Sequence, residues 1–138
     1  MKVFNANTVN TGADSELLVQ FFAFVPTFTG GVNVAAGDLT GDGKVEIIAA
    51  AETNSGPLVR VFSQSGAMLQ SFFAYSPSFT GGVNVAARDI DGDGRADILT
   101  GAGPNGGPHL KAFRGTDVAP LRSTFPFDPD FLGGIFVG

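Results

Sequence analysis

Two nine-residue segments place acidic residues at alternate positions, separated by glycines. They are Asp38–Glu46 (DLTGDGKVE) and Asp89–Asp97 (DIDGDGRAD). Side chains at positions 1, 3 and 5 of such a loop can turn inward, and a glycine at position 6 gives the backbone freedom that a tight turn requires. Calcium binds six to eight oxygen atoms at roughly 2.3–2.6 Å. The two segments therefore indicate two calcium sites.

The expected ligands are side-chain oxygens at positions 1, 3, 5 and 9 and the backbone carbonyl at position 7. These residues are Asp38, Thr40, Asp42, Lys44 and Glu46 in the first loop, and Asp89, Asp91, Asp93, Arg95 and Asp97 in the second. A helix–loop–helix calcium site would need glutamate at position 12, where Ala49 and Thr100 stand. The flanking sequence also has the character of strands. We therefore expect a variant calcium loop held in a β-hairpin.

The alternative for each loop is a hairpin turn with exposed acids, since Asp and Gly favour turns. Two loops in register, each with acids at positions 1, 5 and 9, favour the metal interpretation. Four carboxylates within nine residues also repel one another unless a cation is present. Because the second loop offers four carboxylates and the first offers three, with a neutral Thr40, we expect the second site to bind calcium more tightly.

The elements that position these loops are repeated along the chain. Phe21–Ala36 (FFAFVPTFTGGVNVAA) and Phe72–Ala87 (FFAYSPSFTGGVNVAA) are identical at 13 of 16 positions, with an offset of 51. A third copy begins at Ser123 and runs to Gly138. A period near 50 residues indicates one supersecondary unit that buries its core by stacking on its neighbours.

Each unit contains four short strand candidates with period-two patterns or short apolar runs. The candidates are 32–36, 45–50, 58–62 and 69–75 in the first unit, and 82–87, 96–100, 109–113 and 121–127 in the second. The predicted fold class is all-β, with β-propeller blades, four-stranded antiparallel repeats of about 51 residues, in an incomplete ring. The predicted division is a partial blade at 1–29 (last two strands), blades at 30–80 and 81–132, and a first strand of a truncated blade at 133–138.

Composition excludes several classes of function. The 138 residues carry a net charge of −5, and seven of the 13 acids lie in the two loops. Without cysteine there is no disulfide framework or thiolate metal site, and without a Lys/Arg cluster nucleic acid is not an expected partner. No apolar run is long enough for membrane insertion. The first residues also lack the apolar segment of a signal peptide.

Other motifs are better explained by structure. Gly101–Gly106 matches GxGxxG, but a strand rather than a helix is expected after it, so we interpret it as a turn. His109 has no partner pattern for catalysis, and Asp128 and Asp130 align with Ser76 and Ser78, which argues against a pair for glycoside hydrolysis.

The chain resembles the FG-GAP/VCBS repeat family, which provides the blades of integrin α-subunit propellers and of many bacterial secreted proteins. The resemblance rests on Phe79–Ala87 (FTGGVNVAA), the loop Asp89–Asp97 and Gly101–Pro108 (GAGPNGGP). It implies a seven-bladed propeller, calcium in blade hairpins, and extracellular or cell-surface roles in adhesion or in carbohydrate or protein binding. The chain departs from the family pattern at Thr40 and is far shorter than seven blades.

These observations predict a calcium-binding, non-catalytic binding or adhesion scaffold whose ligand is a protein or a glycan. Two alternatives stay open: a calcium-dependent lectin, or an accessory module of a larger secreted enzyme. Because two whole blades cannot close a ring and leave open edges, we expect a homo-oligomer or part of a longer propeller chain.

Overall fold

The computed structural model describes residues 1–4 and 17–138, and within them the chain is all-β. The strands are β1 (Lys2–Phe4), β2 (Leu17–Gln20), β3 (Val32–Gly37), β4 (Glu46–Ala51), β5 (Leu58–Phe62), β6 (Met68–Phe73), β7 (Val83–Arg88), β8 (Asp97–Ala102), β9 (Leu110–Phe113) and β10 (Pro120–Thr124). They form an antiparallel pair, β1–β2, and two four-stranded antiparallel sheets, β3–β6 and β7–β10. Each larger sheet is a meander in which chain neighbours pair.

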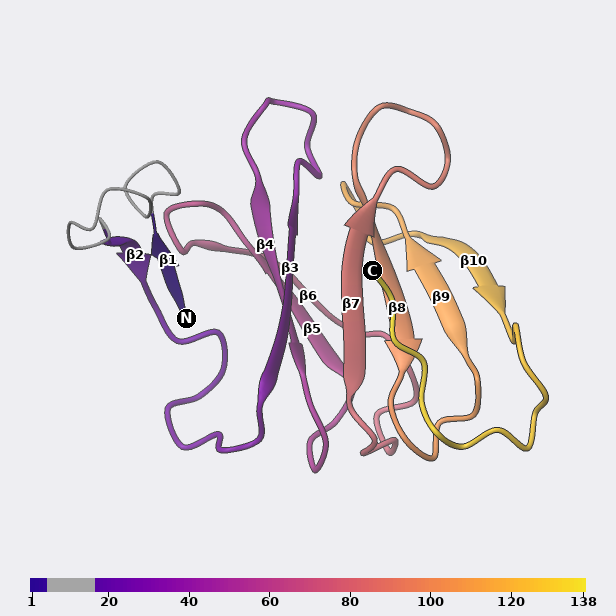
Figure 1. Ribbon diagram of the computed structural model, residues 1–138. Coiled ribbons are helices and arrows are strands. Elements are labelled where there is room, and N and C mark those ends of the chain that lie inside the picture. The colour runs from indigo at the N-terminus through magenta and orange to yellow at the C-terminus, as the bar shows by residue number, and fades with distance from the viewer. Residues whose placement is uncertain (5–16) are drawn as a thin grey trace, which may run out of the picture.

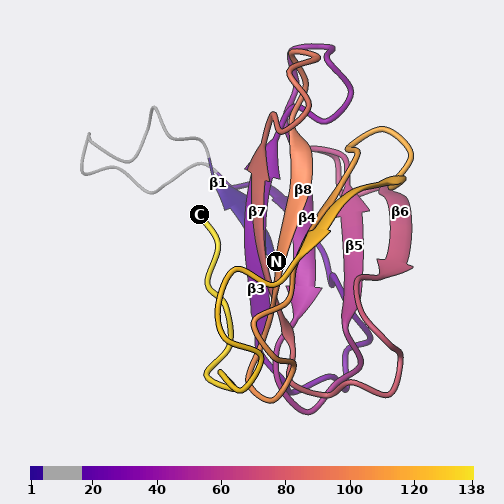
Figure 2. The ribbon, with the colours of Figure 1, turned by 90° about the vertical axis from the view of Figure 1, so that its right-hand side faces the viewer.

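The two larger sheets repeat the same register. β3 pairs with β4 from Val32↔Ala51 to Gly37↔Glu46, and β7 pairs with β8 from Val83↔Ala102 to Arg88↔Asp97. Each acidic loop therefore joins the first and second strands of its sheet, and its position-9 acid opens the second strand. Both loops emerge at the same end of the molecule (Figures 1 and 2).

The hydrophobic core lies between the sheets because each sheet stacks on the next. Every residue of β4 is buried, as expected for a strand covered on both faces. Ile48, Val59 and Val61 of the first sheet pack in one cluster with residues of the second sheet such as Val83 and Ile98. A smaller cluster joins β4 and β5 to the segment that follows β2. The three groups of strands lie side by side in Figure 1.

The same polar contacts recur at successive boundaries between units. The Asn33 side chain donates to Val83 O at 2.9 Å, and Asn84 donates to Ile135 O at 2.8 Å. On the opposite side of the sheets, the Arg60 guanidinium donates to Ala23 O at 2.9 Å, and the Lys111 ammonium donates to Ala74 O at 3.0 Å. Units that stack through one repeated set of contacts are the architecture of a propeller.

The structure confirms the predicted fold class: four-stranded antiparallel blades that form no closed ring within the described residues. The strands agree with the predicted ranges to within a few residues, and β1 and β2 pair with each other. The division of the whole chain at 1–29, 30–80, 81–132 and 133–138 stays a prediction. None of the described residues forms a helix long and apolar enough to cross a membrane.

The C-terminal segment differs from the expectation of a first strand. Residues 134–137 form no regular strand, although Ile135 is buried and its N–H donates to Ala102 O at 2.8 Å. A strand requires a ladder with a neighbour, and no second strand of its own unit pairs with this segment among the described residues. The segment lies against β8 without completing a sheet.

Candidate metal centre

Both acidic loops fold around the aspartate at position 1. Asp38 accepts hydrogen bonds from the N–H groups of Gly41 (2.6 Å) and Gly43 (2.8 Å), and Asp89 accepts them from Gly92 (2.6 Å) and Gly94 (2.9 Å). Gly43 and Gly94 have φ values of 82° and 85°, in the left-handed region that glycine enters without strain. The sequence similarity of the two loops is therefore also a similarity of backbone conformation.

The acid at position 9 is the buried anchor of each loop. Glu46 is 5% exposed and Asp97 is 1% exposed. Glu46 accepts the N–H of Leu39 at 2.8 Å, and Asp97 accepts that of Ile90 at 2.9 Å. A buried carboxylate is costly unless hydrogen bonds or a cation compensate for its lost hydration. These bonds hold position 9 beneath the turn, facing the rest of the loop.

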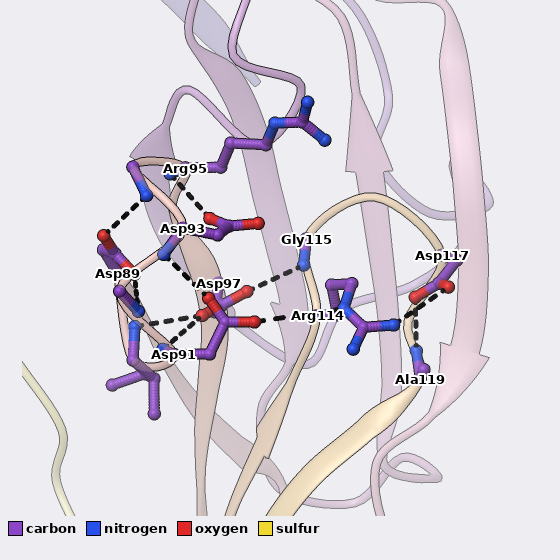
Figure 3. Close-up of polar contacts among 12 residues, drawn as sticks. Asp89, Asp91, Asp93, Arg95, Asp97, Arg114, Gly115, Asp117 and Ala119 are labelled. Carbon is purple, nitrogen blue, oxygen red and sulfur yellow. Dashed lines mark hydrogen bonds and ion pairs between the residues drawn. The ribbon is translucent and has the colours of Figure 1, made fainter.

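Three carboxylates of the second loop converge. Asp89, Asp91 and Asp97 each offer one oxygen, and these oxygens all lie within 4.8 Å of one another. Oxygens that share one calcium at roughly 2.3–2.6 Å can be no more than about 5 Å apart, so the donor set fits the ion in both chemistry and spacing. Figure 3 shows the three side chains and their hydrogen bonds within the loop.

The other predicted ligands of the second loop lie around this group. Asp93 is outside the convergent set, and its carboxylate accepts the N–H of Arg95 at 2.8 Å. The Arg95 side chain points away from the carboxylates (Figure 3), which agrees with a role for its backbone carbonyl only. Asp93 and Arg95 stay predicted ligands.

In the first loop, Asp38, Asp42 and Glu46 do not form a comparably close group of three carboxylates. Asp42 accepts the N–H of Lys44 at 2.9 Å, as Asp93 does from Arg95. Thr40, Asp42, Lys44 and Glu46 all line one surface hollow. The N–H of Gly43, with those of its neighbours in the loop, lowers the pKa of Asp38, because hydrogen bonds to a carboxylate favour its charged form. These hydrogen bonds therefore favour the charged form of Asp38.

The two loops touch each other. The N–H of Ala96 donates to Asp38 O at 2.8 Å, which joins position 8 of the second loop to position 1 of the first. A Cβ at Gly37 would lie 2.8 Å from Ala87 Cβ and 2.9 Å from Ala96 Cβ, so only glycine permits this approach of the strands. The Arg95 side chain lies over the first loop, where a Cβ at Gly41 would meet its Nε at 2.9 Å.

Sequence reasoning missed the turn between β9 and β10. The N–H of Gly115 donates to Asp97 at 3.2 Å, and Arg114 Nε lies 4.0 Å from Asp91 Oδ2. These residues follow the loop by about 20 positions and belong to no motif. One signal was available: Arg114 aligns with Ser63 of the first unit, just as Asp91 aligns with Thr40.

The motifs assigned to structural roles lie away from the loops. Gly101–Gly106 spans the end of β8 and the following turn and precedes no helix. His109 contacts Ser123 Oγ at 2.8 Å and stacks on Phe125. Burial and the nearby Lys111 charge lower its pKa, which favours the neutral ring. Asp128 and Asp130 are exposed in a surface turn.

Stacked antiparallel blades with an acidic hairpin loop define a repeat of the β-propeller class. Comparison with known families identifies the kind of repeat: residues 38–100 match the model of the FG-GAP-like repeat. The matched stretch runs from the first loop through the second, which confirms the resemblance noted from sequence.

Among solved structures, part of a Bacillus licheniformis rhamnogalacturonan lyase is similar in fold. The TM-score is 0.56 at 21% sequence identity, and the match covers 72% of this chain and 24% of the lyase chain. The chain thus corresponds to about a quarter of that enzyme's length. No curated protein gives a significant sequence match.

Proposed function

We propose that this chain is a calcium-binding β-propeller segment that acts as a non-catalytic binding scaffold outside the cell. The observation that carries the proposal is the convergence of Asp89, Asp91 and Asp97 within 4.8 Å, in a loop whose architecture is repeated 51 residues earlier. The FG-GAP-like match supports it because the matched region contains both loops. Calcium would neutralise the carboxylates. It would also stabilise the turn conformation of the loops that join β3 to β4 and β7 to β8.

Calcium titration of the EDTA-stripped protein tests the metal site. We expect heat of binding and a rise in melting temperature with calcium, since a ligand that binds only the folded state stabilises it by mass action. A matched control is Asp128→Asn, which removes an exposed carboxylate outside the loops. An absence of binding, or equal melting temperatures with calcium and EDTA, would refute the metal site.

The scaffold proposal assigns no catalytic residue to the chain. We expect no turnover of common polysaccharides. The decisive comparison is between the native protein and variants at single carboxylates outside the loops, such as Asp128→Asn. Turnover that such a substitution abolishes would contradict the scaffold.

A lectin is the second candidate, favoured by a pocket between the two sheets on the side away from the loops. Its lining includes Tyr75, Phe79, Asn105, His109 and Lys111. Aromatic faces with a few polar groups suit a sugar ring. The similar fold in a rhamnogalacturonan lyase makes rhamnogalacturonan the first probe to test, and it allows a role as a module of a larger secreted enzyme. Glycan-array binding that His109→Leu removes would favour the lectin, whereas binding to proteins alone would favour the scaffold.

A further inference from the structure

Arg114 contacts the metal loop from outside it. It follows β9, and its Nε lies 4.0 Å from Asp91 Oδ2 while Nη1 lies 3.4 Å from Asp117 Oδ2 (Figure 3). Its neighbour Gly115 donates to the buried Asp97. A single turn thus approaches two of the three convergent carboxylates, with a full positive charge beside one of them.

The first unit lacks both members of this pair. Phe62 and Phe113 hold the same register, opposite Ile47 and Ile98, so the residues after them occupy equivalent places. Those residues are Ser63 and Arg114. At position 3 of the loops, Thr40 corresponds to Asp91. The first unit therefore has two neutral residues at these positions, Thr40 and Ser63. The second unit has an aspartate beside an arginine.

We propose that Arg114 is a built-in counter-ion of Asp91 that sets the calcium affinity of the second loop without acting as a ligand. The inference rests on the proposed calcium function. Without the ion, the guanidinium stabilises the carboxylate cluster. When calcium enters, the guanidinium repels it and competes for Asp91. The extra carboxylate of the second loop consequently strengthens calcium binding less than its charge alone would.

The expected effect follows from Coulomb's law. A unit charge and a divalent ion separated by less than 10 Å near a solvated surface repel by an amount that corresponds to roughly a tenfold change in affinity. We expect Arg114→Ser, which installs the residue of the first unit, to tighten calcium binding at the second loop roughly tenfold. The gain should shrink in high salt because ions screen exposed charges.

The experiment is calorimetric calcium titration of variants that also carry Asp42→Asn, a substitution that weakens calcium binding at the first loop. The control Arg122→Ser makes the same charge change on the exposed part of β10, and we expect it to alter affinity by less than twofold. Arg114→Lys keeps the charge and should stay near the native value. The pair Asp91→Thr and Arg114→Ser completes a double-mutant cycle, in which Asp91→Thr should cost more affinity once Arg114 is gone.

Melting temperatures in EDTA check that each variant folds. If the native protein binds calcium but Arg114→Ser matches Arg122→Ser, or if Arg114→Lys tightens binding as much as Arg114→Ser, the counter-ion role is wrong and the calcium site stands. If no variant binds calcium, both the proposed function and the counter-ion role of Arg114 are wrong. If Arg114→Ser alone binds measurably, the counter-ion role is supported in its strongest form.

Discussion

Asp97 and Asp93 belong to the same loop but differ in their surroundings. Asp97 is buried, and N–H groups approach both of its carboxylate oxygens, Gly115 at Oδ1 and Ile90 at Oδ2. Asp93 is exposed and accepts one N–H. An asparagine could replace the Asp93 oxygen but would bring an NH₂ group against a donor at position 97. The two positions therefore separate the structural role of a loop carboxylate from its role toward calcium.

We expect Asp97→Asn to lower the free energy of unfolding by about 1–3 kcal/mol even in EDTA, the cost of unsatisfied buried groups. Asp93→Asn should change it by less than about 0.5 kcal/mol, as for other exposed sites. Urea denaturation of both variants in EDTA measures this difference. Equal losses would mean that the buried hydrogen bonds of Asp97 contribute nothing to stability without the ion.

Tyr75 gives a prediction about alkaline pH. Burial, slightly opposed by a hydrogen bond with Thr100, raises the pKa of Tyr75 to about 12 from 10.0. A raised pKa means that folding favours the protonated phenol, so its contribution to stability is complete below pH 10 and is lost as the pH rises through about 12. Because the chain has one tyrosine, phenolate absorbance follows this group alone.

We expect the folded protein to show a phenolate midpoint near 12, and the protein in denaturant one near 10. Tyr75→Phe installs the residue found at Phe24 in the preceding unit, so the ring should still pack, at a cost of about 0.5–1.5 kcal/mol for the lost hydrogen bonds. This variant should lose less stability between pH 10 and 12 than the native protein. A folded-state midpoint of 10 would show that the hydroxyl is not held as the structure has it.

At the scale of elements, the two acidic loops form one surface. The hydrogen bond from Ala96 N–H to Asp38 O joins them directly. An ion that orders one loop therefore also restrains the hydrogen-bond partner that belongs to the other loop. Two sites that share such an element bind with a coupling free energy, which must be the same in both directions. We expect Asp42→Asn to lower the calcium affinity of the second loop several-fold, although this substitution removes no ligand from that loop.

Calorimetric titration of Asp42→Asn, with Asp128→Asn as control, measures this coupling. The reciprocal variant, Asp93→Asn, should lower the calcium affinity of the first loop by a similar factor. Independent sites, in which each variant changes only the affinity of its own loop, would contradict the coupling.

Much of the strand arrangement was predictable because it is local. Neighbours in the chain determine the alternation of Val83 and Val85 and the turn at Gly92–Gly94. Because the sequence repeats after 51 residues, each of these predictions could be made for both units. The loops could be placed for the same reason. Arg114 and Gly115 were not assigned to the site, because their approach to Asp91 and Asp97 depends on the path of β9; the paired change from Ser63 to Arg114 and from Thr40 to Asp91 was the one signal in the sequence. The irregular course of 134–137 was likewise not predictable, and no strand among the described residues pairs with it in a ladder.

At the scale of the whole molecule, one face of the first blade is open. Val34 on β3 is 58% exposed, whereas the matching Val85 on β7 is 8% exposed beneath the first sheet. Val32 and Val34 also line an apolar groove with Phe22, Phe24 and Val25. The sequences of β3 and β7 are nearly the same, so the surface of a blade that accepts β7 is complementary to β3 as well. A second copy of the chain is the occupant that this similarity favours.

We expect the protein to self-associate in solution and Val34→Lys to weaken that association at least tenfold, because it places a charge on the contact face. Met68→Lys, on an exposed position of the last strand of the same sheet, should leave association unchanged. Sedimentation over a range of concentrations distinguishes the two. A monodisperse monomer that melts cooperatively would contradict the expected oligomer.

The near identity of Phe21–Ala36 and Phe72–Ala87 also affects the route by which the chain folds. Since β3 and β7 share VNVAA, either could pair with β4 or β8, and strand sequence hardly distinguishes the correct partner. The distinction comes from chain length: β3 reaches β4 across eight residues but would reach β8 across 59. That difference in loop-closure entropy amounts to only about 1.8 kcal/mol, so roughly one chain in twenty would first form the wrong pair. Such mispaired chains make refolding yield depend on dilution, because the same exchange can occur between molecules.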